Sequence, residues 1–285
     1  MIRFGPSGNS ESFYEQGNKS SVQMPKWLKN IGLNAYEYQC SKGVKISEEM
    51  SVQLGRSAAE NGIFLSIHAP YYINMASEEK EKRDNSIRYI LETLQAAKWM
   101  NAGRIVVHTG SCSKVSREWA LKTAVEVLKE VIEQADAMGF GNIAICPEVL
   151  GKINQLGTLE EILEMCKTDE RLIPTVDFGH LHARGMGCLN SVPDFEKVIA
   201  QIENSIGSDR LNRLHCHFSR IEFTSGGEKK HCSMRDTQFG PEFEQLAEVI
   251  YRKGLEPVII CESREFMAED ALLMKNIYDK VAGGM

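Results

Sequence analysis

Ile63-Phe-Leu-Ser-Ile-His68 and Arg104-Ile-Val-Val-His108 set the architecture expected of this chain, because both are short, apolar segments typical of buried strands. Between them, the longer amphipathic segment from Glu78 to Met100 predicts a helix. Two strands joined by such a helix predict parallel strands with a crossover connection. Each strand-like segment also ends in a histidine, at the point where the chain turns.

The same alternation runs along the whole chain and repeats eight times. The expected strands are Ile2–Phe4, Ala35–Tyr38, Ile63–His68, Arg104–His108, Asn142–Glu148, Pro174–Asp177, Arg213–His217 and Pro257–Glu262. The expected helices are Met24–Ile31, Ser47–Glu60, Glu78–Met100, Ser116–Met138, Thr158–Cys166, Val192–Ile202, Gln238–Arg252 and Ala268–Val281. Eight such units predict an α/β chain folded as a (β/α)8 TIM barrel, with a doubly wound open sheet as the alternative. No change of composition divides the chain, so residues 1–285 are expected to form a single TIM-barrel domain.

The composition argues against several classes of protein. A net charge of −6 and a pI of about 5.7 do not suit binding to nucleic acid through bulk positive charge, so any contact with DNA must be local. The eight cysteines include no Cys-x-x-Cys pair, which favours reduced thiols inside the cell. The N-terminus lacks the features of a signal peptide, and no segment approaches the ~18 apolar residues of a membrane span. We therefore expect a soluble, cytoplasmic protein with no membrane contact and no obligate protein partner.

Potential metal ligands stand at the ends of the expected strands. They are His68, His108, Glu148, Asp177, His215 and Glu262, with His180 three residues after Asp177 and His231 in the long loop Ser219–Thr237. Imidazole and carboxylate groups are usual ligands of zinc, and the carboxyl ends of barrel strands meet on one face. The spacing of Asp177 and His180 would let them serve two neighbouring ions. These residues therefore predict a metal site at the strand ends.

Each candidate also has an ordinary structural interpretation. A single histidine in a turn is usually hydrogen-bonded, and it is the number of aligned strand ends that favours a metal site. Glu148 and Glu262 end apolar strands, where a buried acid needs a cation or a hydrogen-bond partner, and ion pairs to arginine are the alternative. His182 and His217 each lie two residues beyond a stronger candidate; we interpret both as packing or supporting residues, with a role as metal ligand as the alternative.

The ordered set of ligand types resembles the endonuclease IV family of apurinic/apyrimidinic-site endonucleases, within the xylose-isomerase-like TIM-barrel superfamily. The matching local strings are His68-Ala-Pro-Tyr-Tyr-Ile-Asn74, His108-x-Gly-Ser, Asp177-x-x-His180 and Leu214-His215. The resemblance spans residues 63–262, from the third expected strand to the eighth.

This resemblance implies a zinc-dependent phosphodiester hydrolase that cleaves damaged DNA 5′ to abasic sites, in base-excision repair. Two or three zinc ions per chain are implied. The implied ligand groups are His68 with His108, then Asp177 with His215 and Glu262, then His180 with His231, while Glu148 bridges the first two groups and is the catalytic residue.

Two features depart from the family pattern. The family has an aspartate two residues before the loop histidine, where this chain has Lys229, and an ammonium group offers no lone pair to a metal. Glu228 stands beside it and can serve if the loop shifts, so the third ion is the one that the pattern supports least. The segment after the second strand also lacks the basic DNA-penetrating loop of the family. Tyr72, Lys42 and Lys230 remain as candidate substrate-binding residues, through stacking and phosphate pairing.

A divalent-metal-dependent sugar isomerase or epimerase of the same superfamily is the main alternative. Such an enzyme needs only Glu148 and the second ligand group around one metal, with two glutamates placed to move a proton beside a carbonyl. Those ligands do not separate the two functions. The further histidines His68, His108, His180 and His231 favour the nuclease, because an enzyme with one metal has no use for them. A non-catalytic metal-binding or regulatory barrel is a third possibility.

Overall fold

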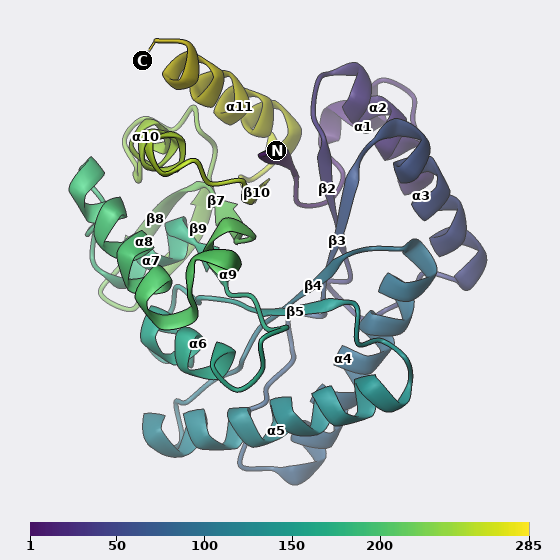
Figure 1. The fold of residues 1–285 in the computed structure, drawn as a ribbon, viewed down its shortest axis with the longest axis vertical. Coiled ribbons are helices and arrows are strands. Elements are labelled where there is room, and N and C mark those ends of the chain that lie inside the picture. Colours follow the sequence, from purple (N-terminus) through teal and green to yellow (C-terminus); the bar gives the residue numbers. More distant parts are fainter. Residues whose placement is uncertain (285) are drawn as a thin grey trace.

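The computed structural model describes residues 1–284, and within them eight parallel strands form a closed barrel (Figure 1). The barrel strands are β1 (Arg3–Pro6), β2 (Ala35–Gln39), β3 (Phe64–His68), β4 (Arg104–Val107), β5 (Ala144–Pro147), β6 (Thr175–Asp177), β7 (His215–Phe218) and β10 (Val258–Cys261). They pair in the orders β1-β10-β7-β6 and β2-β3-β4-β5, and the bridges Ser7–Glu37 and Glu148–Thr175 join the two sheets at both seams. The predicted α/β TIM barrel is confirmed.

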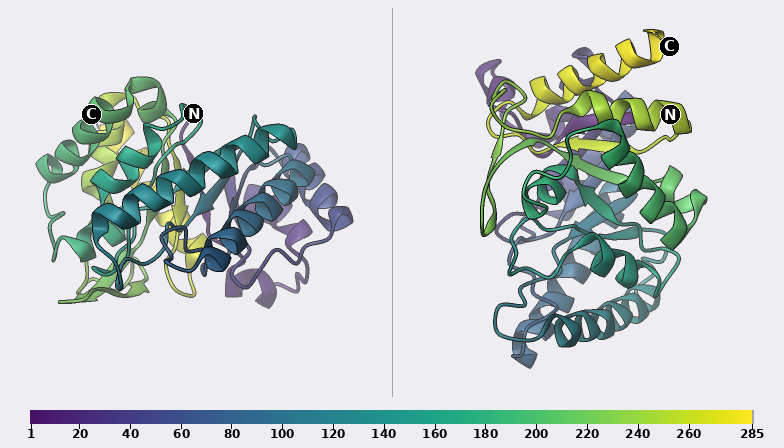
Figure 2. Two further views of the ribbon diagram at one scale, coloured as in Figure 1. Left: turned by 90° about the horizontal axis from the view of Figure 1, so that it is seen from below. Right: turned by 90° about the vertical axis from the view of Figure 1, so that its left-hand side faces the viewer.

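Helices surround the barrel on its outer side (Figure 2). The main ones are α2 (Met24–Asn30), α3 (Glu48–Asn61), α4 (Lys80–Met100), α5 (Arg117–Ala137), α6 (Leu159–Cys166), α8 (Val192–Ile206), α10 (Phe243–Lys253) and α11 (Met267–Gly284). The sequence did not predict the short helices α1 (Glu11–Glu15), η1 (Ser21–Gln23), α7 (Phe178–Arg184) and α9 (Ser208–Asn212), because one or two turns show little periodicity. Among the helices of residues 1–284, none is both long and apolar enough to cross a membrane.

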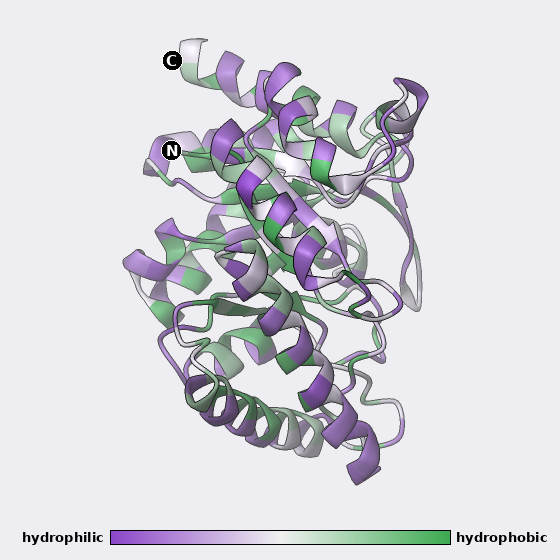
Figure 3. Cartoon of the chain, turned by 90° about the vertical axis from the view of Figure 1, so that its right-hand side faces the viewer, coloured by the Kyte–Doolittle hydropathy of each residue, from purple (hydrophilic) through white to green (hydrophobic). Residues whose placement is uncertain are grey.

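Local chemistry fixes where the helices begin and end. The side chains of Ser47, Ser116 and Thr158 each accept a hydrogen bond from a backbone N–H in the first turn of α3, α5 and α6. Gly62 and Gly254 follow α3 and α10 with φ of 68° and 63°, a left-handed conformation that glycine adopts without steric cost. The helices in Figure 3 alternate between hydrophilic and hydrophobic residues, as helices with one side on a barrel and one in solvent do.

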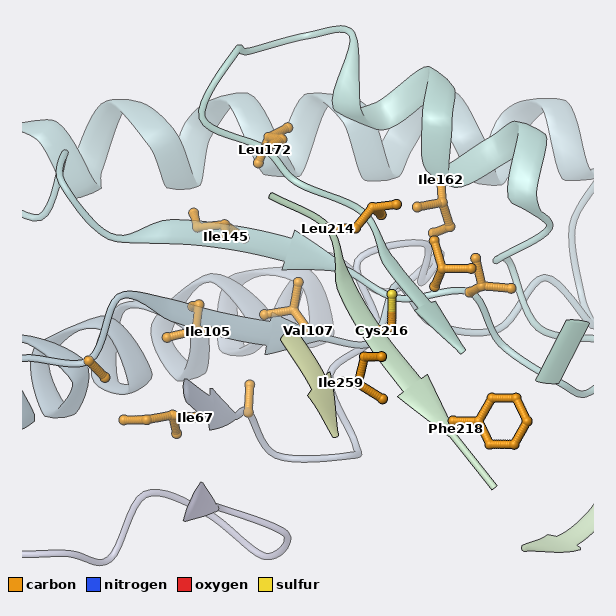
Figure 4. Close-up of a cluster of buried hydrophobic side chains, with 14 of the residues drawn as sticks. Ile67, Ile105, Val107, Ile145, Ile162, Leu172, Leu214, Cys216, Phe218 and Ile259 are labelled. Carbon is orange, nitrogen blue, oxygen red and sulfur yellow. The ribbon is translucent and has the colours of Figure 1, made fainter. Parts of the chain in front are cut away.

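The main hydrophobic core lies between the strands and the helices (Figure 4). Cys216 and Phe218 of β7, and Leu214 directly before it, belong to this core. Because successive side chains of a strand point to opposite faces, His215 and His217 of β7 point into the barrel instead. The same alternation turns the other strand-end candidates towards the barrel axis, which is how residues distant in sequence come together.

The segment Ser219–Thr237, expected to be a long loop, contains an antiparallel hairpin. Its strands are β8 (Arg220–Thr224) and β9 (Gly227–Cys232), and their register shifts between Glu222 and Phe223. Gly227 has a φ of 89° and allows the tight turn between the strands. The segment was expected as a long loop, and the hairpin within it was not predicted, because the strand signal is weak among its charged residues.

Candidate metal centre

The interior of the barrel holds both apolar and charged side chains. The apolar ones form small clusters, with Val258 and Ile260 beside Ala35, and Val106 beside Cys146. Towards the carboxyl ends of the strands, the inward positions carry carboxylates and imidazoles instead. Buried charges of this kind are stable only when they have partners, so the arrangement of these groups shows what they can bind.

A first ligand group forms around one oxygen of Glu148. His68 Nε2 lies 3.3 Å from Glu148 Oε2, and His108 Nε2 lies 3.0 Å from the same oxygen. His68 Nδ1 lies 2.8 Å from the carbonyl oxygen of Ala69, a contact that fixes the orientation of its ring. Two imidazole nitrogens that converge on one buried carboxylate oxygen form a set of ligand atoms suited to a divalent cation.

A second ligand group forms around the other oxygen of Glu148. His217 Nδ1 lies 3.0 Å from Glu148 Oε1 and 3.4 Å from Glu262 Oε1. Asp177 completes the group, and the four ligand atoms lie within 4.8 Å of one another. Glu148 therefore faces a different set of ligands with each of its two oxygens.

Asp177 tests whether a cation fits this place. Its Oδ1 accepts a hydrogen bond of 2.7 Å from the backbone N–H of His180 and so begins α7. Its Oδ2 is buried and makes no hydrogen bond to any atom of residues 1–284. Burial raises the pKa of Asp177 above its ordinary value, although the neighbouring histidines act to lower it. His180 Nδ1 lies 3.4 Å from Oδ2, and a bound cation would give this oxygen a closer partner.

A third ligand group lies between α7 and the β8–β9 hairpin. His180 Nε2 lies 3.2 Å from His231 Nε2 and 3.4 Å from Glu228 Oε2. Ser219 Oγ and His231 Nδ1 are 2.8 Å apart, which leaves the Nε2 atom of His231 directed towards His180. Asp177, His180 and His231 form a further set of atoms close enough to hold one ion.

A β-bulge places Glu228 on the inner side of the hairpin. In regular strands, residues three apart such as Glu228 and His231 would face opposite sides. Here Glu228 pairs with Phe223 and Lys230 pairs with Glu222, so Lys229 is the extra residue. Lys229 and Lys230 both turn to Glu222, with Nζ–oxygen distances of 2.6 and 3.2 Å. The bulge therefore lets an acid and a histidine at this spacing face the same ion.

The buried carboxylates and imidazoles of the site shift the pKa values of one another. Burial lowers the pKa of His68, but its hydrogen bond to Glu148 and the nearby carboxylates raise it to about 9. Burial likewise lowers the pKa of His180, but the charges of Asp177 and Glu228 raise it to about 9. Burial raises the pKa of Glu262, but His217 holds it at about 2. The raised pKa values of His68 and His180 favour protonated rings in the metal-free protein, and bound metal ions would replace these protons.

The structure brings together most of the ligands that the sequence predicted, with one exchange. His68, His108, Glu148, Asp177, His180, His231 and Glu262 all lie in the three groups. His215 does not join the second group, and His217 occupies the place expected for it. The pairing of β6 with β7 explains the exchange, since it sets Asp177 level with His217 and Thr175 level with His215. The geometry therefore favours the alternative in which His217 is a metal ligand.

Sequence reasoning also missed Glu37 and did not select Glu228. Glu37 stands in the apolar strand β2, and its Oε2 lies 2.9 Å from His215 Nε2. A glutamate inside an expected apolar strand was a signal that could have identified it. His182 lies apart from the three groups, against the ring of Phe223, and accepts a hydrogen bond from the backbone N–H of Leu189.

Two of the three residues expected to bind substrate lie near each other. Tyr72 is 41% exposed and packs edge-on against Tyr89. A Cβ atom added to Gly43 would lie 3.2 Å from the hydroxyl of Tyr72, so the exposed Lys42 is in the neighbouring loop. Lys230 instead pairs with Glu222 on the outer side of the hairpin.

Comparisons with known proteins place this chain in a family of TIM barrels. A family model described as Xylose isomerase-like TIM barrel matches residues 25–277. An uncharacterized protein of Methanocaldococcus jannaschii is 30% identical over 282 residues, which cover 99% of this chain and 98% of the relative. A probable endonuclease 4 of Staphylococcus carnosus is 28% identical over 79% of this chain and 75% of its own length.

Solved structures share the fold at lower identity. A D-tagatose 3-epimerase-like protein has a TM-score of 0.73 at 20% identity, with 99% of each chain covered. Endonuclease IV from Thermus thermophilus has a TM-score of 0.70 at 18% identity, covering 99% of this chain and 100% of its own. At such identities these likenesses establish the barrel and leave the reaction open.

Proposed function

From the premise that this chain belongs to the xylose isomerase-like TIM barrel family, we propose that it is a metal-dependent phosphodiester hydrolase that cleaves DNA 5′ to abasic sites. The observation that carries the proposal is the geometry of Glu148, whose two oxygens face two separate ligand groups. A carboxylate that bridges two ions is what a clustered metal site for phosphoryl transfer requires. The relatives named probable endonuclease 4 support the choice of DNA as substrate.

Zinc suits the donor atoms of all three groups, which are imidazole nitrogens and carboxylate oxygens. The proposed ligands are His68, His108 and Glu148 for the first ion, Glu148, Asp177, His217 and Glu262 for the second, and His180, His231 and Glu228 for the third. Divalent ions held there would supply Lewis acidity, which activates water for attack at phosphorus and neutralises charge on the phosphodiester oxygens.

The residues of the chain perform three further tasks. Glu148 holds the first and second groups at a fixed separation, because it is fully buried and contacted from both sides. Ser219 fixes the ring of His231, so that its Nε2 stays directed at His180. Tyr72 and Lys42 offer an exposed ring and a cation on one side of the site, where they can stack on a base and pair with a phosphate.

The test uses the metal-loaded protein and a duplex oligonucleotide that carries a tetrahydrofuran abasic analogue, at low salt. We expect incision on the 5′ side of the analogue and loss of incision in His108→Ala. His182→Gln is the matched control, because His182 is a buried histidine on the same side of the barrel that belongs to none of the three groups. Absence of incision by fully loaded wild-type protein would refute the proposal.

A sugar isomerase or epimerase is the second candidate function. The observation that favours it is the second group, which contains enough ligands for one divalent metal without the other two. Its two glutamates, Glu148 and Glu262, both contact His217 Nδ1 and could serve as a pair of proton-transferring carboxylates beside a metal-bound sugar. Epimerisation of a free ketose that survives His108→Ala, with one metal ion per chain, would establish this function instead.

A further inference from the structure

Glu37 is a fully buried carboxylate of β2 that contacts His217 of the second ligand group. Its Oε1 lies 3.1 Å from His217 Nε2. The other nitrogen of the same ring, Nδ1, is the one that faces Glu148 and Glu262 in the second ligand group. The imidazole of His217 therefore stands between Glu37 and the place where the second metal ion would bind.

We propose that Glu37 is a positioning residue of the second metal site, which acts through His217. A carboxylate beside one nitrogen of an imidazole keeps the proton on that nitrogen, so the opposite nitrogen carries the free lone pair that a metal needs. The same contact fixes the orientation of the ring and makes the ligand nitrogen more basic. This inference rests on the metal centre of the proposed function, but not on which substrate the enzyme uses.

Glu37 does not form a further metal site of its own. Glu37, His215 and His217 do provide three ligand atoms close to one another. However, the two imidazoles contact different oxygens of Glu37, with His215 on Oε2 at 2.9 Å and His217 on Oε1 at 3.1 Å. At Glu148 the imidazoles of His68 and His108 converge instead on one oxygen. Contacts that diverge in this way do not define one ion: His215 Nε2 makes a hydrogen bond to Oε2, while His217 Nε2 lies beside Oε1 as a charged neighbour.

His215 and Ser66 hold Glu37 in the orientation that this role requires. Both approach the same oxygen, since Ser66 Oγ donates to Glu37 Oε2 at 2.8 Å and His215 Nε2 lies 2.9 Å from it. Oε1 is thereby left to face His217, with Gln39 Nε2 at 3.4 Å as its other neighbour. The two histidines of β7 thus have different roles. His217 would bind the second metal ion, and His215 supports the carboxylate of Glu37 that contacts His217.

Glu37→Gln tests the proposal with little change in volume. The amide of glutamine has one oxygen and no charge, so it cannot place an oxygen beside His217 and accept from the His215–Ser66 side at once. We expect one zinc ion to bind roughly 10- to 100-fold more weakly, a loss typical of removing the partner of a ligand histidine. Competition with a chelator measures this loss without any substrate. Asp270→Asn is the matched control, because it neutralises a buried carboxylate that contacts Ser233 and Met234 instead.

Two further measurements separate positioning from general destabilisation. Histidine 15N spectra of the zinc-loaded protein should show His217 protonated at Nε2 in the wild type and shifted in Glu37→Gln, while the signals of His68 stay unchanged. In a His217→Ala background, Glu37→Gln should cause no additional loss of zinc affinity, because Glu37 acts only through that ring.

Unchanged zinc affinity together with unchanged His217 signals in folded Glu37→Gln would overturn the proposal, and so would additive losses in the double variant. If Glu37→Gln does not fold, Ser66→Ala decides the question. A loss of a few-fold in zinc affinity then supports the role of Glu37, and wild-type affinity refutes it. None of these outcomes depends on cleavage of DNA, so they are distinct from the test of the proposed reaction.

Discussion

The first and second ligand groups of the candidate metal centre lie at the strand ends, whereas the third depends on the β8–β9 hairpin. These strand-end groups and this hairpin group are built in different ways. Glu148, Asp177 and His217 are fully buried, and neighbouring barrel strands supply them in fixed register. Glu228 and His231 come from a hairpin outside the barrel sheet, and their side chains are 18% and 22% exposed. The strand-end groups can change only if the barrel changes. The hairpin group depends on how the hairpin docks.

Docking of the hairpin rests on the loop that follows β5. The backbone N–H of Glu228 donates to Gly151 O, and the N–H of Ile153 donates to Gly226 O, each at 3.1 Å. Arg184 donates to the carbonyl groups of Leu150 and Lys152 and so holds the shape of this loop. A Cβ atom at Gly151 would lie 2.6 Å from Glu228 Cβ, so only glycine allows this close approach. The hairpin group is therefore the more easily perturbed part.

Glu148→Gln should have the largest effect, because it acts on both strand-end groups at once. The amide keeps the shape of the side chain but loses the charge that balances two ions. We expect activity on any substrate of the wild type to fall by about a thousandfold or more, with the fold intact. Steady-state kinetics and circular dichroism measure the two quantities. Near-normal turnover with full metal content would show that Glu148 does not bridge the groups.

Glu228→Ala should affect the hairpin group alone. We expect one of three zinc ions to bind roughly 10- to 100-fold more weakly and to leave first during titration with a chelator. Lys229→Ala is the matched control, because Lys229 lies on the outer side of the bulge and pairs with Glu222. Equal effects of the two substitutions would contradict the assignment of Glu228 as the inward-facing residue.

The stability of the metal-free protein should depend on pH through His68 of the first ligand group and His180 of the third. The pKa values of His68 and His180 are about 9, above the value of about 6.5 in an unfolded chain. Raised pKa values stabilise the folded protein fully below pH ~6.5, and this stability is lost as the pH rises through ~9. We expect Tm to fall by roughly 5 °C over that interval in chelator-treated protein and much less in zinc-loaded protein. A rising Tm in the metal-free protein would reverse the sign and contradict the expectation.

The smallest effect is expected at the surface. Lys42→Ala should weaken binding of abasic DNA a few-fold and reduce the salt slope by about one, as loss of one phosphate contact does. Lys230→Ala should do less, because Lys230 already pairs with Glu222. Fluorescence anisotropy at several salt concentrations compares the two variants. A larger loss in Lys230→Ala would mean that the outer side of the hairpin, and not the Tyr72 side, contacts DNA.

Much of the barrel follows from local patterns. The eight expected strands match the observed ones to within a few residues, because short apolar runs and long amphipathic segments differ in period and length. The hairpin in Ser219–Thr237 escaped prediction, because its strands are short, charged and stabilised by the loop after β5. Antiparallel pairing of such a segment depends on its docking site more than on its own residues.

Residue types at the strand ends were enough to indicate a cluster of metal ligands, because parallel strands of a barrel must bring their carboxyl ends to one face. The choice between His215 and His217 was beyond local reasoning. Both point inward, and only the register of β7 against β6 sets His217 level with Asp177. Glu37 reaches His215 across 178 residues of sequence, a contact that closure of the barrel creates. Long-range register and a single bulge in β9 thus assign roles that composition and spacing leave open, because both arise from pairing between distant segments.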